Sequence, residues 1–332
     1  MDSVGWQQTR NIIAYPHGWQ HPVITEQHAY ECVCGNLPDN SNVTYIGFPW
    51  ATLIDLLLTK QEQKADHYLQ MLQQIPQDTA RCRITVAQHV YVHRFTEIFE
   101  KAGITDLFWV HATHDLANLG KVRIHPFPHF PVRCLDIPDL DDQPGKPLKE
   151  RKYLYSFVGA YAPFYLTKAR HWIAKLPRTA DSCILSRNEW YYQSIVFDKQ
   201  IFEKPIEPQK QLQLKEDAES YRHILEETIF SLCPSGSGPN SIRLWESLGF
   251  GNIPVILADS LKLPGNLQEW QDAAIFVPED KKSIKLLPSK LRELAKRQDI
   301  LDRYQSALRG LWRKYGHKSF IYDLLQFCKH IT

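Results

Sequence analysis

Short apolar runs alternate with amphipathic segments through the first third of the chain, as in strands followed by helices. The run 43–58 predicts a strand that turns at Pro49 into a helix. The runs 82–90 and 106–113 predict two more buried strands, and 91–104, with apolar residues at helical spacing, predicts the helix between them. Strands that alternate with helices indicate parallel β-α-β units.

A stretch rich in proline and charge, 136–152, is predicted to connect this region to a second alternating one. There the pattern predicts strands at 153–161, 230–234 and 253–259, and helices at 165–176, 220–229 and 241–250. A helical end with a break near Gly316 follows. We therefore expect two α/β lobes that face a cleft, 1–145 and 146–310, and a helical tail, 311–332, that packs back toward the first lobe.

Composition argues against several functional classes. The 332 residues are 43% hydrophobic and 23% charged with a net charge of only +2, which is typical of a globular protein and argues against a nucleic-acid coat or a polybasic membrane anchor. The N-terminus lacks the pattern of a signal peptide, and no apolar run is long enough to span a membrane. Seven cysteines form no disulfide framework, so we expect reduced thiols in a cytoplasmic protein.

The segment 230–259 carries the strongest chemical signal. A loop of small residues follows a predicted strand and opens a predicted helix, so its N–H groups and the helix dipole favour an anion such as a phosphate. Arg243 in the first turn is suited to pair with that phosphate, and Glu246, on the same face, to accept hydrogen bonds from a ribose diol. The candidate binding residues are Ser235, Gly236, Ser237, Gly238, Asn240, Ser241, Arg243 and Glu246.

Three other interpretations of this segment compete with a phosphate site. Arg243 and Glu246 are spaced as an ordinary surface ion pair, which contributes roughly 0.2–0.5 kcal/mol. A P-loop is excluded because no lysine occurs between 230 and 259. The dinucleotide pattern begins at Gly236 and Gly238 but has Ser241 in its third glycine position, so a nicotinamide enzyme is a distant alternative.

The same segment resembles the signature of the exostosin-like glycosyltransferases. Residues 106–115 and 151–161 also resemble family segments, whereas the first 80 residues carry no motif that aligns. Small changes from the signature stand at Ser231, Ser247 and Asn252. The positions that match are Phe230, Leu232, Cys233, Pro234, Gly236, Ser241, Arg243, Glu246, Gly251, Ile253, Pro254 and Val255.

The resemblance implies a GT-B fold, with a nucleotide-sugar donor on the second lobe and a glycan or polysaccharide acceptor on the first. Arg243 would bind the diphosphate and Glu246 the ribose of a uridine diphosphate sugar, and transfer would invert the anomeric centre. No cofactor and no nucleic-acid partner are implied, and peripheral membrane association is left open. The alternative is a non-catalytic carbohydrate-binding or regulatory protein of the same fold.

Such a transfer needs a base for the acceptor hydroxyl. His114 and Asp115 follow a predicted strand and are the candidates, although Asp115 is also placed to cap the next helix; His89 is the reserve. Asp139 and Asp141 resemble a metal-binding pair, but they lie in the predicted connection and are interpreted as solvated loop. The histidines lack a compact metal spacing, so no metal is assigned.

Overall fold

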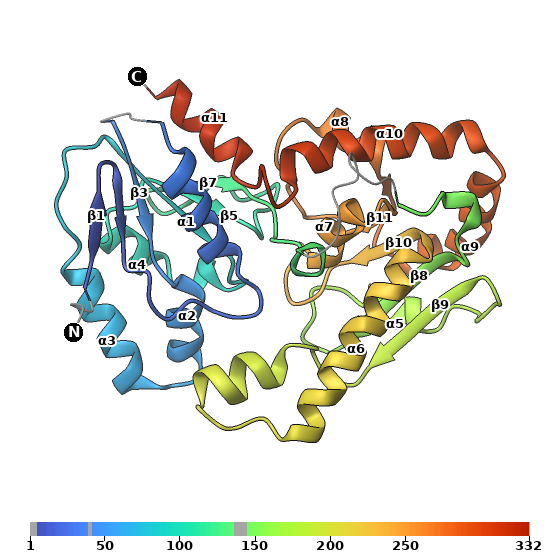
Figure 1. The fold of residues 1–332 in the computed structure, drawn as a ribbon, viewed down its shortest axis with the longest axis horizontal. Coiled ribbons are helices and arrows are strands. Elements are labelled where there is room, and N and C mark those ends of the chain that lie inside the picture. Colours follow the sequence, from blue (N-terminus) through green and yellow to red (C-terminus); the bar gives the residue numbers. More distant parts are fainter. Residues whose placement is uncertain (1–4, 39–41, 136–144, 332) are drawn as a thin grey trace.

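A computed structural model describes residues 5–38, 42–135 and 145–331 and has two α/β lobes side by side (Figure 1). Each lobe is built on its own sheet and encloses its own hydrophobic core. The two-lobed GT-B architecture with closing helices that the sequence predicts is confirmed.

The first lobe is built on a seven-stranded sheet in the order β1-β2-β3-β4-β5-β7-β6. β2, β3, β4, β5 and β7 are parallel, and the short strands β1 and β6 pair antiparallel at the two edges. The parallel strands are mostly buried and rich in β-branched residues, as expected of strands covered on both faces. The strands are β1 (Gln7–Thr9), β2 (Ile12–Ala14), β3 (Val43–Gly47), β4 (Cys82–Ala87), β5 (Asp106–Trp109), β6 (Asn118–Leu119) and β7 (Val122–Pro126).

Helices cover this sheet, and one helix and one strand of the lobe differ from the predictions. The predicted helix at 91–104 is divided into a 3₁₀ turn (Val92–Arg94) and α4 (Thr96–Lys101). The predicted strand at 106–113 ends at Trp109, after which the chain leaves the sheet. The other helices of the lobe are α1 (Thr25–Asn36), α2 (Trp50–Leu58) and α3 (Glu62–Gln73).

The second lobe has a five-stranded, wholly parallel sheet in the order β12-β11-β10-β8-β9. The chain passes from β8 outward to β9 and then crosses back to β10 on the other side of β8. The strand order therefore reverses between β8 and β10, which is where open α/β sheets bind ligands. The strands are β8 (Tyr153–Ala160), β9 (Ser182–Arg187), β10 (Thr228–Pro234), β11 (Ile253–Leu257) and β12 (Ile275–Phe276).

In the described residues six α-helices accompany this sheet, and a π-helical segment, Ser194–Ile201, extends toward the first lobe. α7 sits behind β10 and β11 with Leu244 and Leu248 in the core, as their helical spacing predicts, and Trp245 is buried beside them. α6 is much longer than the predicted helix at 220–229 and begins at Pro208, which suits the first helical position because it has no N–H to satisfy. The α-helices are α5 (Ala169–Ala174), α6 (Pro208–Glu226), α7 (Ile242–Gly249), α8 (Leu267–Ala273), α9 (Lys281–Ala295) and α10 (Gln298–Tyr315).

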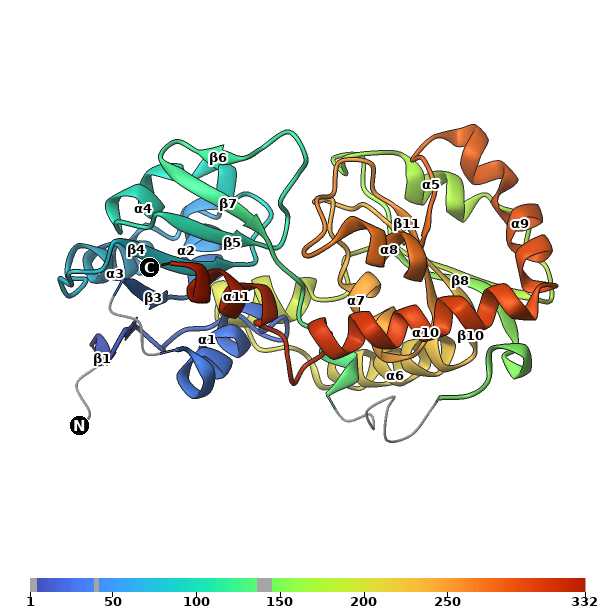
Figure 2. The same cartoon turned by 90° about the horizontal axis from the view of Figure 1, so that it is seen from above.

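The C-terminal segment returns to the first lobe (Figure 2). α10 ends at Tyr315, so the predicted break near Gly316 is confirmed, and a Cβ on Gly316 would lie 2.6 Å from the carbonyl oxygen of Trp312. Beyond it, α11 (Tyr322–His330) packs Leu324 and Cys328 into the core of the first lobe. Of the predicted connection at 136–152, residues 136–144 lie outside the described residues, and Asp139 and Asp141 with them.

Candidate active site

A cavity of about 650 Å³ lies between the two lobes and is lined by both. Its walls come from the carboxyl ends of strands, because 88–91 follow β4, His111 follows β5, 158–160 close β8 and 236–238 follow β10. Ligands of open α/β sheets bind at this edge, where loops and helix N-termini gather. The cavity is therefore the candidate active site.

Two glycines in the loop after β10 lie too close to neighbouring residues to be replaced by residues with side chains. A Cβ on Gly236 would lie 2.8 Å from Nη2 of Arg170, and a Cβ on Gly238 would lie 2.5 Å from Nδ1 of His111. Gly238 thus brings the backbone of the second lobe against the first lobe, next to Val90 as well as His111. The two glycines are needed for this close approach.

Arg243 is held at the edge of the cavity, with only 6% of its surface exposed. Its Nη1 donates to the carbonyl oxygen of Leu232 at 3.5 Å, and its Nη2 donates to that of Val158. The ring of Phe157 lies 4.8 Å from the guanidinium carbon. Among the described residues its buried Nε has no hydrogen-bond partner. The Arg243 side chain is therefore fixed beside the end of β8, and its Nε–H can still donate a hydrogen bond to a ligand.

A second arginine, Arg170 of α5, lies at the same point. Its Nε donates to the carbonyl oxygen of Ser235 at 2.7 Å, and a Cβ on Gly159 would lie 3.4 Å from its Nη1 and 3.2 Å from Nη2 of Arg243. Burial, and then the charge of Arg243, lower the pKa of Arg170 to about 10, so it stays charged at neutral pH. Two neighbouring guanidinium groups favour a ligand with several anionic oxygens, such as a diphosphate.

Glu246 lies one turn further along α7, is 1% exposed and lines the same cavity. Its Oε2 accepts a hydrogen bond from the hydroxyl of Tyr221 at 2.9 Å, whereas its buried Oε1 has no partner in the described part of the chain. Burial raises the pKa of Glu246 against the opposing effect of Arg133. A buried acceptor without a partner is costly, so this oxygen is suited to a ligand hydroxyl.

The other predicted loop residues have different surroundings. Gly236, Ser237, Gly238, Asn240 and Ser241 line the cavity, whereas Ser235 is turned inward and hydrogen-bonded to Glu279. Asn240 donates to the carbonyl oxygen of Val110 at 2.6 Å and so joins the lobes. The Ser241 side chain makes no capping hydrogen bond to α7. The structure thus brings seven of the eight predicted binding residues to one wall, and only Ser235 lies outside it.

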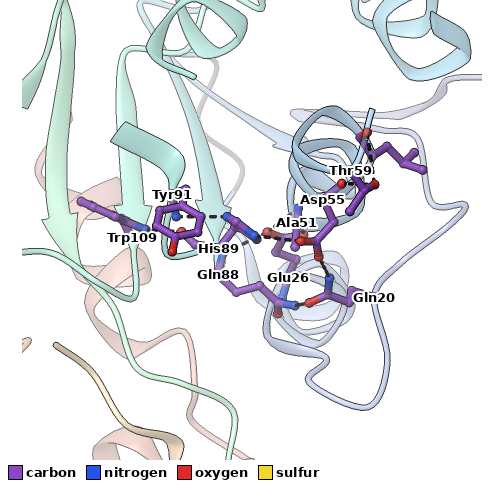
Figure 3. Close-up of polar contacts among 10 residues, drawn as sticks. Gln20, Glu26, Ala51, Asp55, Thr59, Gln88, His89, Tyr91 and Trp109 are labelled. Atoms are coloured by element: carbon purple, nitrogen blue, oxygen red, sulfur yellow. Dashed lines mark hydrogen bonds and ion pairs between the residues drawn. The ribbon is translucent and has the colours of Figure 1, made fainter. Parts of the chain in front are cut away.

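The opposite wall carries a chain of polar side chains (Figure 3). Asp55 of α2 accepts a hydrogen bond from Nε2 of Gln20 at 2.5 Å and contacts Nε2 of His89 at 3.2 Å. Gln20 in turn accepts from Gln88 at 3.2 Å. All four residues line the cavity. Except for the reserve candidate His89, this group was missed by the sequence analysis, because its members come from separate segments.

Glu26 lies behind this wall and caps the start of α2. It is 2% exposed and accepts hydrogen bonds from the backbone N–H groups of Ala51, at 3.1 Å, and Gln88, at 2.9 Å. Burial raises its pKa to about 8 in spite of these two donors, and the charge of Asp55 adds to the increase. The folded protein therefore keeps the Glu26 proton at pH values where the unfolded chain releases it.

This difference predicts a pH-dependent stability. Because the pKa of Glu26 is higher in the folded state, the free energy of unfolding should fall as pH rises from about 4.5 to about 8, by up to about 1.4 kcal/mol per pH unit. Glu26→Gln, which mimics the protonated acid, should remove this slope and raise the melting temperature at pH 8 but not at pH 4.5. Thermal unfolding across this range compares the variant with wild type; parallel curves for the two proteins would contradict the assignment.

Two buried histidines complete the wall. His111 and His129 are each 7% exposed, and their rings lie 5.0 Å apart at 75°. In the described chain neither Nδ1 has a hydrogen-bond partner. Burial lowers the pKa of His129 to about 3 and holds that of His111 well below its usual range, so both are neutral. Since His111 touches the loop at Gly238, these rings are placed to contact a ligand on that loop.

Residues 190–202 extend from the second lobe to the first and close one side of the cavity. The yellow-green helix below α2 in Figure 1 belongs to this segment. Ile201 enters the core of the first lobe, and its carbonyl oxygen accepts from Lys64 at 3.0 Å. The aromatic side chains that the segment adds to the cavity are Trp190, Tyr191, Tyr192, Phe197 and Phe202.

His114 and Asp115, the predicted bases, do not line the cavity. Because β5 ends four residues earlier than predicted, the position at its carboxyl end is taken by His111. The chain then turns outward, Thr113 pairs with Leu261, and both predicted bases are exposed. Their catalytic role stays a prediction that no contact in the cavity supports.

Within residues 5–38, 42–135 and 145–331, no cluster of three or more histidine, cysteine, aspartate or glutamate side chains could hold a metal ion. No helix in these ranges combines the length and apolar character needed to cross a membrane.

Two sheets whose carboxyl ends face a shared cavity, with the predicted anion-binding loop at the switch point of the second, define a protein of the GT-B class. The model of the exostosin GT47 domain matches residues 63–292, and the chain belongs to this family. The family resemblance found in the sequence is thereby confirmed.

Curated relatives match shorter segments. A probable glucuronosyltransferase of Oryza sativa subsp. japonica is 43% identical over 19% of this chain and 15% of its own length. A probable beta-1,4-xylosyltransferase of Arabidopsis thaliana is 32% identical over 31% of this chain and 30% of its own length. The chain thus spans less than a third of these relatives. A solved alpha-glucosyltransferase in complex with UDP and DNA overlays 94% of this chain and 88% of its own, with 14% identity and a TM-score of 0.48.

Proposed function

We propose that the protein is a glycosyltransferase that moves a sugar from a uridine diphosphate sugar to a glycan acceptor, with inversion and without a metal ion. The observation that carries the proposal is the convergence of Arg170, Arg243 and the unpaired Oε1 of Glu246 at the switch point of the second sheet. Membership of the exostosin family and relatives named for glucuronosyl and xylosyl transfer support the same activity.

In this proposal each wall of the cavity has one task. The two guanidinium groups bind the diphosphate and stabilise the negative charge that develops on it as the sugar departs. They supply the positive charge that a divalent cation provides in other sites. Glu246 accepts hydrogen bonds from the ribose, and the wall formed by the first lobe receives the acceptor hydroxyl.

The test is a donor and ligand panel on the purified protein. UDP should raise the melting temperature, because a ligand that binds only the folded state stabilises it by mass action, whereas NAD should not. UDP-glucuronic acid and UDP-xylose are then offered with xylo-oligosaccharide acceptors, and the anomeric configuration of the product is read by NMR. Transfer that survives EDTA and inverts the configuration is expected. A shift with NAD alone would contradict the proposal, and a shift with UDP without transfer to any acceptor would favour a non-catalytic protein.

A further inference from the structure

We propose that Asp55 is the catalytic base of the cavity, taking the proton from an acceptor sugar hydroxyl that binds against the first lobe. The inference rests on the proposed transferase function. Asp55 is 3% exposed, yet it lines the cavity together with Gln20 and His89 on the wall formed by the first lobe (Figure 3). Asp55 lies inside α2 rather than at its N-terminus, and the basic side chain beside it is the imidazole of His89.

The hydrogen bonds of His89 fix which of its nitrogens carries the proton. The backbone N–H of Tyr91 donates to Nδ1 at 3.0 Å, so Nδ1 is an acceptor without a proton. The ring proton is therefore on Nε2, which donates to Oδ1 of Asp55 at 3.2 Å. The indole of Trp109 anchors the same loop by donating to the carbonyl oxygen of His89 at 2.9 Å. His89 therefore has no lone pair left to take a proton from the hydroxyl of the acceptor sugar, and it is a positioning residue.

Asp55, unlike His89, retains lone pairs that can accept a further hydrogen bond. Each carboxylate oxygen has two lone pairs, and in the described chain Oδ1 receives one donor from His89 and Oδ2 one from Gln20. The side chain is held from two directions, and each oxygen can still accept a further hydrogen bond. A carboxylate fixed in this way at a cavity wall is placed to bind a hydroxyl and to take its proton.

The donor site lies next to this wall. Gly238 of the anion-binding loop packs against both Val90 and His111, and Val90 directly follows His89 in the chain. The segment that positions Asp55 therefore touches the loop that would hold the diphosphate. A sugar extending from that loop enters the space shared by the two walls.

The step balances without a further reactant. The acceptor oxygen forms a bond to the anomeric carbon as its proton passes to Asp55. The bond between that carbon and the diphosphate oxygen breaks, and its electron pair stays on the diphosphate, beside Arg170 and Arg243. The proton leaves Asp55 for water after the products depart.

The other candidates fit less well. In the described chain Nδ1 of His111 is unpaired, but burial and the neighbouring His129 and His89 disfavour the imidazolium that a base must become. Asp115 and His114 are exposed and do not line the cavity.

The test compares Asp55→Asn with wild type, uses Asp66→Asn, an exposed aspartate of α3, as the control, and includes Asp115→Asn as the rival candidate. Asp55→Asn should lower the rate of transfer to a sugar hydroxyl by at least about a hundredfold, the usual effect of removing a general base. UDP should still raise its melting temperature, because the donor site is untouched. Sodium azide, a nucleophile with no proton to lose, should restore turnover by forming a glycosyl azide in this variant.

A second variant tests the assignment through its pH–rate profile. Asp55→Glu keeps the carboxylate one methylene further out, so transfer should be slower but should keep the acidic limb of its pH–rate profile, which Asp55→Asn should lose. If the asparagine variant does not fold, slower transfer by Asp55→Glu with an unchanged UDP shift still tests the assignment. Transfer by Asp55→Asn close to the wild-type rate, no azide product, or a comparable loss in Asp115→Asn would each overturn the assignment. If wild type itself neither binds UDP nor transfers a sugar, the proposed function fails instead.

Discussion

Arg243→Ala is expected to abolish the stabilisation by UDP and to lower kcat/KM for transfer by about 10²–10³-fold, the usual effect of removing one donor to a developing negative charge. Arg243 is fixed by Val158, Leu232 and Phe157 before any ligand arrives, so it needs little reorganisation to meet a diphosphate. Thermal shift with UDP and steady-state kinetics measure the two effects.

Two variants make this result specific. Arg243→Lys keeps the charge but not the planar fork, so it should retain part of the UDP shift and only a small part of the activity. Arg303→Ala removes an exposed arginine of α10 and should behave as wild type. A full UDP shift in Arg243→Ala would place the diphosphate elsewhere in the cavity.

Glu246→Gln is expected to weaken UDP binding by about 10–100-fold, because a hydrogen bond to a charged group contributes about 1.5–3 kcal/mol. The loss should depend on the ribose. Wild type should bind UDP more tightly than its deoxyribose analogues, whereas the variant should lose most of this preference, since Oε1 is the acceptor without a protein partner.

Deoxyribose analogues of UDP serve as the control for the Glu246→Gln variant. Calorimetric titration of both proteins with UDP, 2′-deoxy-UDP and 3′-deoxy-UDP gives a double-mutant cycle in which changes unrelated to the ribose cancel. Tyr221 keeps a hydrogen-bond partner in the glutamine variant, so the fold should survive. Equal losses of affinity for all three ligands would contradict a contact between Glu246 and the ribose.

The second lobe could be read largely from the sequence. The strand, the loop of small residues and the helix are consecutive, so 230–250 carry the geometry of an anion site in one continuous segment. Helical spacing alone puts Arg243 and Glu246 on one face, and the structure has them lining one wall. Arg170 was not found, because it belongs to another helix and reaches the site only through the packing of α5 against the sheet.

The first lobe could not be read in the same way. Its prediction depended on where β5 ends, and an error of four residues replaced the buried His111 with the exposed His114 and Asp115. Strand ends are set by where hydrogen-bonded pairing with the neighbouring strands stops, which a single sequence does not show. Asp55 lies inside an apolar helix pattern, where nothing in the spacing marks it as a site residue.

The sequence alone determined the α/β class through its periodicity and the family through the signature that it resembles, and it placed the predicted anion-binding wall through residues a few positions apart. Only the tertiary structure decided the opposite wall. Gln20, Asp55, His89 and His111 come from four segments, and residues 190–202 reach the first lobe from the second. Contacts between segments so distant in the chain are selected by how sheets and helices pack, and each residue of that wall shows its role only beside the others.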